Sequence, residues 1–219
     1  IVSAAGVIEA NRDHLTQLDA AIGDADHGIN LSRGFTAVLG ALDSAAKTPG
    51  AILTLTGNTL ISKVGGASGP LYGTAFRRAG KALGGAADVD LAALSAALEA
   101  ALAGVKQLGA AREGDKTMVD ALAAATRAFS KAITEGASPD DALDSLAEAA
   151  SAGAAATISM QALKGRGKRE HPDLGEFCGG RLHALACGPY STFGELEVVR
   201  DVADNVVIAT GYSDVPYMP

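Results

Sequence analysis

The sequence predicts an all-α protein over about its first three-quarters. Apolar residues recur at spacings of three and four, as on one face of a helix, most clearly over 90–107. Before residue 165 no stretch alternates apolar and polar residues as a half-buried strand does. Alanine-rich stretches at 121–125 and 152–156 combine high helix propensity with small side chains, which let helices approach closely. These observations argue against an α/β fold for this part of the chain.

The helices can be placed in chain order from their apolar stripes and end signals. Thr48 and Pro49 introduce the third helix, and Gly109 is a plausible stop for the fifth. The sixth is expected to start near Asp115. Ser138 is the expected N-cap of the seventh, with a proline and two aspartates in its first turn. The expected helices are 3–20, 29–46, 50–64, 70–83, 90–107, 115–136 and 139–164.

Composition changes after about residue 165. The remainder holds three of the four tyrosines, both cysteines and four of the seven prolines. Residues 195–199 and 205–210 are β-prone, although a helix over 196–204 is a competing interpretation. We therefore divide the chain into a helical domain at 1–166 and a divergent C-terminal segment of the same domain at 167–219.

Charge and cysteine usage exclude several classes of function. With 18 basic and 25 acidic residues the net charge is −7, which argues against nucleic acid or an anionic membrane as partner. No run of about 18 apolar residues and no secretory leader is found, so we expect no membrane span and a cytoplasmic protein. The two cysteines have no zinc-site spacing and are expected to be reduced thiols.

The main chemical feature is a group of three aspartates, Asp19, Asp24 and Asp26. On one continuous helix a five-residue step turns about 500°, so the first two would not share a face. They converge only if the helix ends between them, which Gly23 and Gly28 permit. Crowded carboxylates repel one another unless a cation is present, and Mg²⁺ prefers such oxygen ligands. The alternative is that Asp and Gly simply favour turns and N-caps here.

Three further motifs are weaker when taken singly. Residues 65–73 join two helices, and Ser68 would lie at a helix N-terminus, where phosphate binds favourably. The alternative is that the glycines only make a tight connection between the helices. Residues 114–118 start a helix, where Asp115 would act as an ordinary N-cap. Residues 164–169 contain four cations, which either grip phosphate or form a solvated helix end.

Taken in order, the four motifs resemble subunit L of the bacterial dihydroxyacetone kinases over about residues 5–166. The segments that carry the resemblance are LDAAIGDADHGINLSRGF, GGASGPLYGTAF, GDKTMVDAL and KGR. The resemblance implies an antiparallel barrel of about eight helices with a nucleotide at one end. After KGR the chain departs from the family, with His171, Asp173 and Gly175 as a shortened remnant of its pattern. The C-terminal segment would then replace the last helix.

The resemblance also implies site residues. Asp19, Asp24 and Asp26 would be ligands of two Mg²⁺ ions that bridge the phosphates of ADP or ATP. No catalytic residue is implied on this subunit alone. The residues expected to contact the nucleotide are His27, Gly28, Ile29, Asn30, Ser68, Gly69, Gly109, Met118, Arg166 and Asp173.

The family further implies a phosphoryl donor that acts with a partner. Subunit K would hold dihydroxyacetone covalently on a histidine, and a phosphotransferase subunit M, a transcription regulator and a second copy of the chain are further candidate partners. Two other functions stay open: a related kinase domain for another acceptor, and a nucleotide-sensing interaction protein that has lost turnover. Seven helices would leave an apolar groove, so the tail is expected to cover it through Phe177, Leu182, Leu185, Phe193, Leu196 and Val199.

Overall fold

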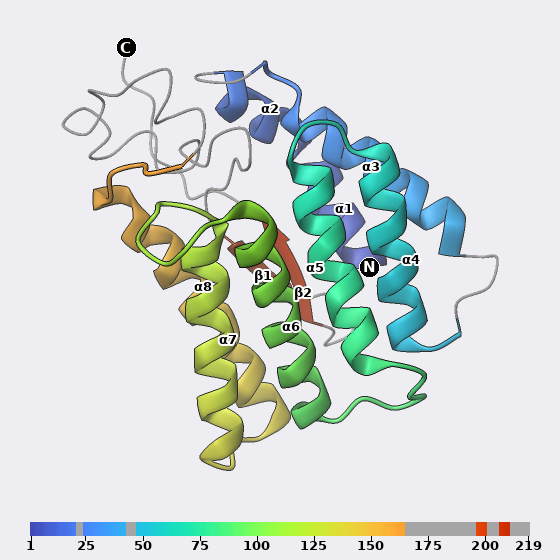
Figure 1. The fold of residues 1–219 in the computed structure, drawn as a ribbon, viewed down its shortest axis with the longest axis vertical. Coiled ribbons are helices and arrows are strands. Elements are labelled where there is room, and N and C mark those ends of the chain that lie inside the picture. The colour runs from blue at the N-terminus through green and yellow to red at the C-terminus, as the bar shows by residue number, and fades with distance from the viewer. Residues whose placement is uncertain (21–23, 43–46, 165–195, 201–205, 211–219) are drawn as a thin grey trace.

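The computed structural model describes residues 1–20, 24–42, 47–164, 196–200 and 206–210. Among these residues there are eight α-helices, one short 3₁₀ turn and one β-hairpin (Figure 1). The helices are α1 Val2–Ala10, α2 Arg12–Ala20, α3 His27–Leu42, α4 Pro49–Lys63, α5 Ser68–Leu83, α6 Leu91–Gly109, α7 Met118–Thr134 and α8 Pro139–Ala156. The prediction of an all-α fold before residue 165 is confirmed.

Helix starts follow the capping signals in the sequence. The Thr48 side chain accepts a hydrogen bond from the Ala51 amide at 3.3 Å before α4, and Ser138 does the same for Asp141 at 3.2 Å before α8. Asp90 caps α6 by accepting from the Ala93 amide at 2.7 Å. Each side chain satisfies a backbone donor that has no partner within its helix.

Three predicted boundaries were wrong. The helix expected over 3–20 is divided at Asn11, whose side-chain amide donates to the Val7 carbonyl at 2.9 Å and so competes with helical backbone pairing. The sixth expected helix corresponds to α7 and begins at Met118 rather than near Asp115, because Thr117 is its N-cap. The last helix ends at Ala156 and not near Lys164, and the 3₁₀ turn Thr157–Ser159 follows it.

Successive helices from α3 to α8 alternate in direction and form the wall of a barrel, each packed on the next (Figure 1). Because of this alternation, the segments before α3, between α4 and α5, and between α6 and α7 lie at one end. Their residues therefore meet there although they are far apart in the sequence.

The hairpin lies where the wall would otherwise be open. Strands β1 Leu196–Arg200 and β2 Val206–Thr210 pair antiparallel, with Leu196 opposite Thr210 and Arg200 opposite Val206. β1 lies beside α8 and β2 lies beside α1, so the hairpin connects the two ends of the helical wall. The β-prone interpretation of this segment is confirmed, and the competing helix over 196–204 was wrong.

The core consists of three apolar clusters between neighbouring helices. The first joins α1 to α4 around Leu31, Phe35 and Leu60. The second lies mainly between α7 and α8, around Phe129 and Leu146. The third joins α5, α6 and α7, and extends the core to the end of the barrel that carries the candidate site.

Helix α6 is, within the described part of the chain, the one helix long and apolar enough to cross a membrane by length and composition alone. Alanine, glycine and serine lie between the leucines of α6, and no membrane span was predicted from the sequence. Leu94 and Leu98 pack against the α7–α8 cluster, while Leu102 packs against the cluster shared with α5. These contacts place α6 in the barrel wall.

Candidate metal centre

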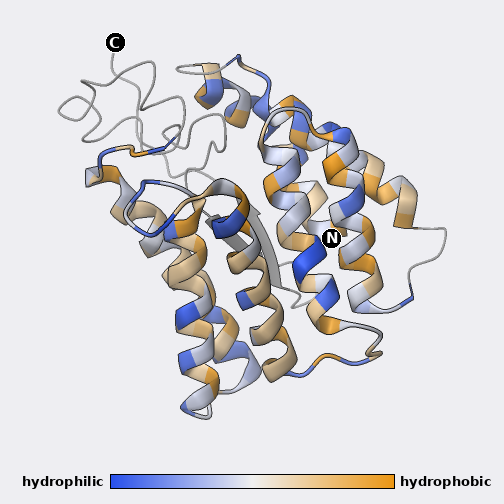
Figure 2. Ribbon diagram, viewed as in Figure 1, coloured by the Kyte–Doolittle hydropathy of each residue, from blue (hydrophilic) through white to orange (hydrophobic). Residues whose placement is uncertain are grey.

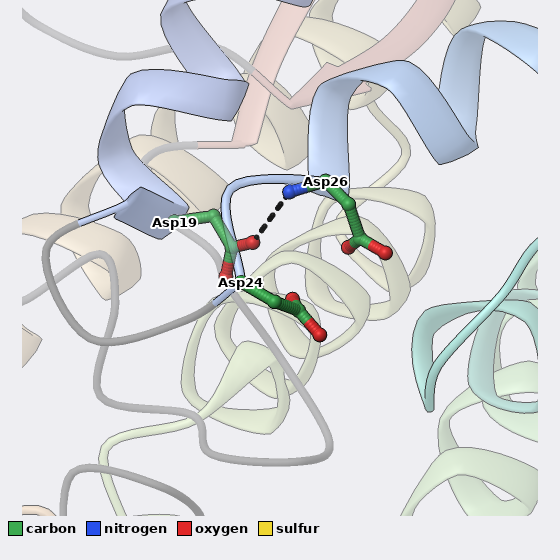
Figure 3. A group of neighbouring side chains, drawn as sticks. All are labelled: Asp19, Asp24 and Asp26. Atoms are coloured by element: carbon green, nitrogen blue, oxygen red, sulfur yellow. Dashed lines mark hydrogen bonds between the residues drawn. The ribbon is translucent and has the colours of Figure 1, made fainter.

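Three carboxylates from two segments converge at one end of the barrel. Asp19 lies at the end of α2, and Asp24 and Asp26 lie in the turn before α3 (Figure 3). One oxygen from each side chain can be chosen so that all three atoms lie within 4.8 Å of one another. The sequence predicted this convergence from a helix that ends between Asp19 and Asp24, and α2 does end at Ala20.

Backbone geometry holds the turn in place. Ala25 adopts a left-handed conformation with φ of 57°, which turns the chain between Asp24 and Asp26. The Asp26 amide then donates to Asp19 Oδ2 at 3.0 Å, and the Asp26 carbonyl accepts from the Asn30 amide at 2.8 Å. One residue thus ties the end of α2 to the first turn of α3.

The electrostatics of the cluster favour a cation. Burial raises the pKa of Asp19 above its ordinary value, and the charges of Asp24 and Asp26 raise it further, while hydrogen bonds from the amides of Asp26 and His27 act in the opposite direction. Asp19 is only 6% exposed, whereas Asp24 is exposed to solvent. A divalent cation bound here would offset both the repulsion and the cost of burying the charge. The three aspartates are the residues that would hold Mg²⁺.

The next residues along the chain divide into buried and exposed ones. His27 and Asn30 are buried, and burial lowers the pKa of His27 to about 4, so its ring is neutral at pH 7. Ile29 is 50% exposed beside them. The Asn30 side chain accepts a hydrogen bond from Arg33 at 2.7 Å. Of these predicted nucleotide contacts, Ile29 therefore has the side chain that is most accessible to a ligand.

From the sequence, Gly28 was expected to permit a helix to end, but Gly28 does not end one. It lies in the first turn of α3, where a β-carbon would lie 1.9 Å from the Arg12 carbonyl oxygen and 2.7 Å from Thr16 Oγ1. Glycine is needed because α3 touches the backbone of α2 at this point. That contact keeps the carboxylate of α2 beside the turn that carries the other two.

The glycine-rich segment between α4 and α5 abuts the start of α3. A β-carbon on Gly65 would lie 3.3 Å from the side-chain Nδ2 of Asn30. Ser68 opens α5, is buried, and donates from Oγ to the Gly65 carbonyl at 3.3 Å. A β-carbon on Gly69 would lie 2.4 Å from the Val64 carbonyl oxygen, so this glycine permits the tight helix–helix connection. The predicted phosphate loop is thus adjacent to the aspartate turn.

Gly109 and Met118 come together around Leu71. Gly109 ends α6, and a β-carbon there would lie 3.5 Å from a methyl of Leu71. Met118 opens α7 and belongs to the same buried cluster as Leu71. Two predicted nucleotide contacts therefore lie together, next to the first turn of α5.

The loop before α7 contains buried polar residues whose roles the sequence did not reveal. Lys116 is 0% exposed and has a φ of 59°, with its ammonium group 3.5 Å from the Ile158 carbonyl. Thr117 and Asp120 form a capping box, and Asp120 also accepts from the Gly114 amide at 2.5 Å. The Thr-x-x-Asp spacing was the available signal for this box. The Asp115 carboxylate accepts from the Arg112 amide instead of capping the helix.

Arg166 and Asp173, the remaining predicted nucleotide contacts, lie outside the described residues. So do Phe177, Leu182, Leu185 and Phe193 of the predicted tail contacts. The backbone of Leu196 and Val199 lies in β1.

The fold and its aspartate cluster define a helical barrel with a candidate divalent-cation site at one end. The DAK2 domain model matches residues 21–176, which is most of the chain. The chain belongs to the DAK2 domain family, together with the ADP-binding subunits of dihydroxyacetone kinases, and the resemblance seen in its motifs is confirmed.

Several relatives are similar over most of this chain. The ADP-binding subunit DhaL of the PEP-dependent dihydroxyacetone kinase of Escherichia coli K12 is 41% identical over 73% of this chain and 77% of its own length. The corresponding subunit of kinase 2 from Listeria innocua is 41% identical over 80% of this chain and 81% of its own. Triokinase/FMN cyclase of Rattus norvegicus is 38% identical over 70% of this chain and 27% of its own.

The fold also resembles a solved structure. The dihydroxyacetone kinase of C. freundii, in complex with AMP-PNP and Mg²⁺, superimposes with a TM-score of 0.57 at 27% identity, over 85% of this chain. This chain spans 32% of that longer kinase chain.

Proposed function

We propose that this chain is the nucleotide-binding, phosphoryl-donating subunit of a dihydroxyacetone kinase. The observation that carries the proposal is the convergence of Asp19, Asp24 and Asp26 within 4.8 Å at the end of a DAK2 barrel. The names of the E. coli and L. innocua relatives, which are ADP-binding subunits, support ADP or ATP as the ligand. The C. freundii complex with AMP-PNP and Mg²⁺ supports the metal.

In this proposal the three aspartates hold two Mg²⁺ ions against the nucleotide phosphates. The bound metal supplies charge neutralisation during phosphoryl transfer. The residues of this chain do the rest: the start of α3 from His27 to Asn30, together with Ser68 and Gly69, borders the phosphates. Gly109 and Met118 flank the adenine. Arg166 and Asp173 complete the contacts from the C-terminal segment.

The acceptor would be dihydroxyacetone held on a partner subunit K, which the names of the relatives, subunits of dihydroxyacetone kinases, support. Subunit M is a further partner where the phosphoryl source is a phosphotransferase protein, as the PTS-dependent name of the Lactococcus lactis relative suggests. A transcription regulator and a second copy of the chain are additional partners that we propose. The chain would act in the cytoplasm, with 1–166 as the nucleotide-binding domain and 167–219 as its divergent closing segment.

Two measurements on the purified chain test nucleotide binding. Nucleotide released by heat is identified and quantified, and ADP binding is then measured by calorimetry with and without Mg²⁺. We expect about one nucleotide per chain when Mg²⁺ is present and much weaker binding when it is chelated. Binding that does not depend on a divalent cation would contradict the proposed role of the three aspartates.

A further inference from the structure

A cationic groove runs along the outer face of the barrel, between α4, α5 and α6. Its volume is about 1290 Å³, and three basic side chains of α5, Arg77, Arg78 and Lys81, line it. None of the described residues that line the groove is acidic. Figure 2 shows a hydrophilic stretch midway along α5, between its two neighbouring helices. This groove has no part in the function proposed above.

Glycines on the flanking helices shape the groove around the arginine stems. A β-carbon on Gly57 of α4 would lie 2.6 Å from Cγ of Arg77, and a β-carbon on Gly104 of α6 would lie 2.8 Å from Cγ of Arg78. Side chains at either glycine would displace these stems. The two arginines can therefore lie against the neighbouring helices while their charged ends stay exposed.

The positive charge in the groove is not neutralised within the described part of the chain. Arg77, Arg78 and Lys81 are all exposed, and none forms an ion pair with a described carboxylate. Arg78 donates to the neutral side chain of Gln107 at 3.0 Å. The N-terminus of α4 and the C-terminus of α5 both border the groove, at Gly50 and Gly84, so their partial charges offset each other and the three side chains carry the net positive charge. In a chain of net charge −7, this is a local reversal of sign.

The size and lining of the groove indicate what kind of ligand fits. Its volume exceeds the roughly 300–1,000 Å³ that is typical of small-molecule pockets. The described residues that line the groove include three cations and no aromatic residue. Nucleic acid binds through many phosphate contacts and through base stacking on aromatic rings, so this groove does not fit it. Leu55 and Leu108 border the groove, and Leu108 is 48% exposed, so apolar contact is available beside the charges.

We propose that this groove docks an acidic helix of a partner protein. Arg77 and Lys81 are four residues apart on α5, so they lie about 6 Å apart along one face, and acidic residues at the same spacing on a partner helix would match them. The docked helix would place apolar residues on Leu55 and Leu108. Lys81 is thirteen residues beyond Ser68, or about 20 Å along α5, so this end of the groove is remote from the proposed phosphate contacts, whereas Leu108 at the other end precedes Gly109 of the proposed adenine contact.

The test uses the full chain and a defined probe. The probe is a fluorescent alanine-based helical peptide with two glutamates four residues apart and one leucine beside them, and its control has glutamine at both positions. We expect the glutamate peptide to bind better than the glutamine peptide, with an affinity that falls as salt rises. Arg77→Glu and Lys81→Glu should each weaken binding by about tenfold or more.

Matched controls separate docking from overall charge and from folding. Lys131→Glu makes the same charge change on α7, at an exposed residue outside the groove, and should change the affinity by less than about twofold. ADP binding should be unchanged in all three variants.

Equal binding of the two peptides, or equal weakening by Lys131→Glu, would overturn the proposal. Complete displacement of the peptide by inorganic phosphate at constant ionic strength, which would indicate a small-anion site, would also overturn it. So would a dimer that dissociates in Arg77→Glu, since the groove would then hold a second copy.

Discussion

The backbone amide of Asp26 donates a 3.0 Å hydrogen bond to Oδ2 of Asp19, which joins two residues that the sequence separates by seven positions. Through this bond, one candidate ligand fixes the orientation of another. This bond and the one from the His27 amide occupy part of the acceptor capacity of Asp19, and the remaining lone pairs of its carboxylate can face a metal ion. The aspartates therefore differ: Asp19 is buried and accepts this hydrogen bond, while Asp24 is exposed to solvent.

This difference predicts unequal effects of removing the aspartates. Asp24→Ala and Asp26→Ala should abolish Mg²⁺-dependent ADP binding and leave the metal-free protein as stable as before, or more so, because like-charge repulsion is relieved. Asp19→Ala should also abolish binding but should give a lower free energy of unfolding than the other two variants, because the Asp26 amide loses its acceptor. Calorimetry and thermal unfolding in EDTA measure both properties. Unchanged affinity and Mg²⁺ dependence in either of the first two variants would refute the metal site.

Two glycines of α3 provide a matched test of the contact between α2 and α3. Gly28→Ala should lower the free energy of unfolding by about 1–3 kcal/mol and weaken ADP binding, because the new methyl group meets the Arg12 carbonyl. Gly40→Ala, in the same helix, meets nothing within 4 Å and should be stabilising by about 0.5–1 kcal/mol. Denaturant unfolding measures both, and a neutral Gly28→Ala would contradict the close approach.

The segment before α5 gives a test of the phosphate contact. Ser68→Ala should weaken ADP binding by about 1–2 kcal/mol, as expected for a hydrogen bond to a charged group. Ser62→Ala, at an exposed serine of α4, is the control and should have no effect on binding. Gly69→Val should have a larger effect than Ser68→Ala, because its side chain would push α5 away from the Val64 carbonyl. Negligible effects of both site variants would leave the segment as a helix connection only.

Lys116 tests the loop that precedes α7. Lys116→Ala should lower the free energy of unfolding by about 1–3 kcal/mol, because a fully buried side chain and its contact to the Ile158 carbonyl are lost. The exposed Lys131→Ala should stay within about 0.5 kcal/mol of the wild type. If chemical denaturation gave equal stabilities for the two variants, Lys116 would have no structural role.

Because the hairpin lies beside both α8 and α1, we predict that the C-terminal segment closes the barrel. Truncation after Lys164 removes the strands that lie beside α8 and α1, so apolar surface should become exposed and the melting temperature should fall. Nucleotide affinity should also fall, because Arg166 is lost. Limited proteolysis is the complementary measurement. Rapid trimming to about residue 170, with a folded core that binds ADP normally, would be incompatible with this role.

The sequence predicted most of the fold because the helical stripes, caps and glycines are local signals. Thr48, Asp90 and Ser138 act within three residues of their targets, so the helix starts could be read directly, although Asp90 was not singled out. The break at Asn11 was missed because the apolar stripe continues through it.

The candidate site was predictable in part. The aspartate convergence was predicted on condition that the helix ended between Asp19 and Asp24, but the packing role of Gly28 depends on α2 in three dimensions. The burial of Lys116 was also hidden, since a lysine in a polar loop is usually exposed and its partner Ile158 lies 42 positions away.

If this chain donates a phosphoryl group from a Mg²⁺-bound nucleotide to dihydroxyacetone on subunit K, as we propose, product formation should depend on the chain and on its aspartates. The most direct measurement is a coupled assay that combines the purified chain with subunit K, dihydroxyacetone and a phosphoryl source, either ATP or the phosphotransferase proteins with subunit M. Dihydroxyacetone phosphate should form only when this chain and Mg²⁺ are both present, and none should form with Asp24→Ala. If the chain binds ADP with Mg²⁺ but forms no product with either source, it is not the phosphoryl donor, and a sensing role or another acceptor is favoured.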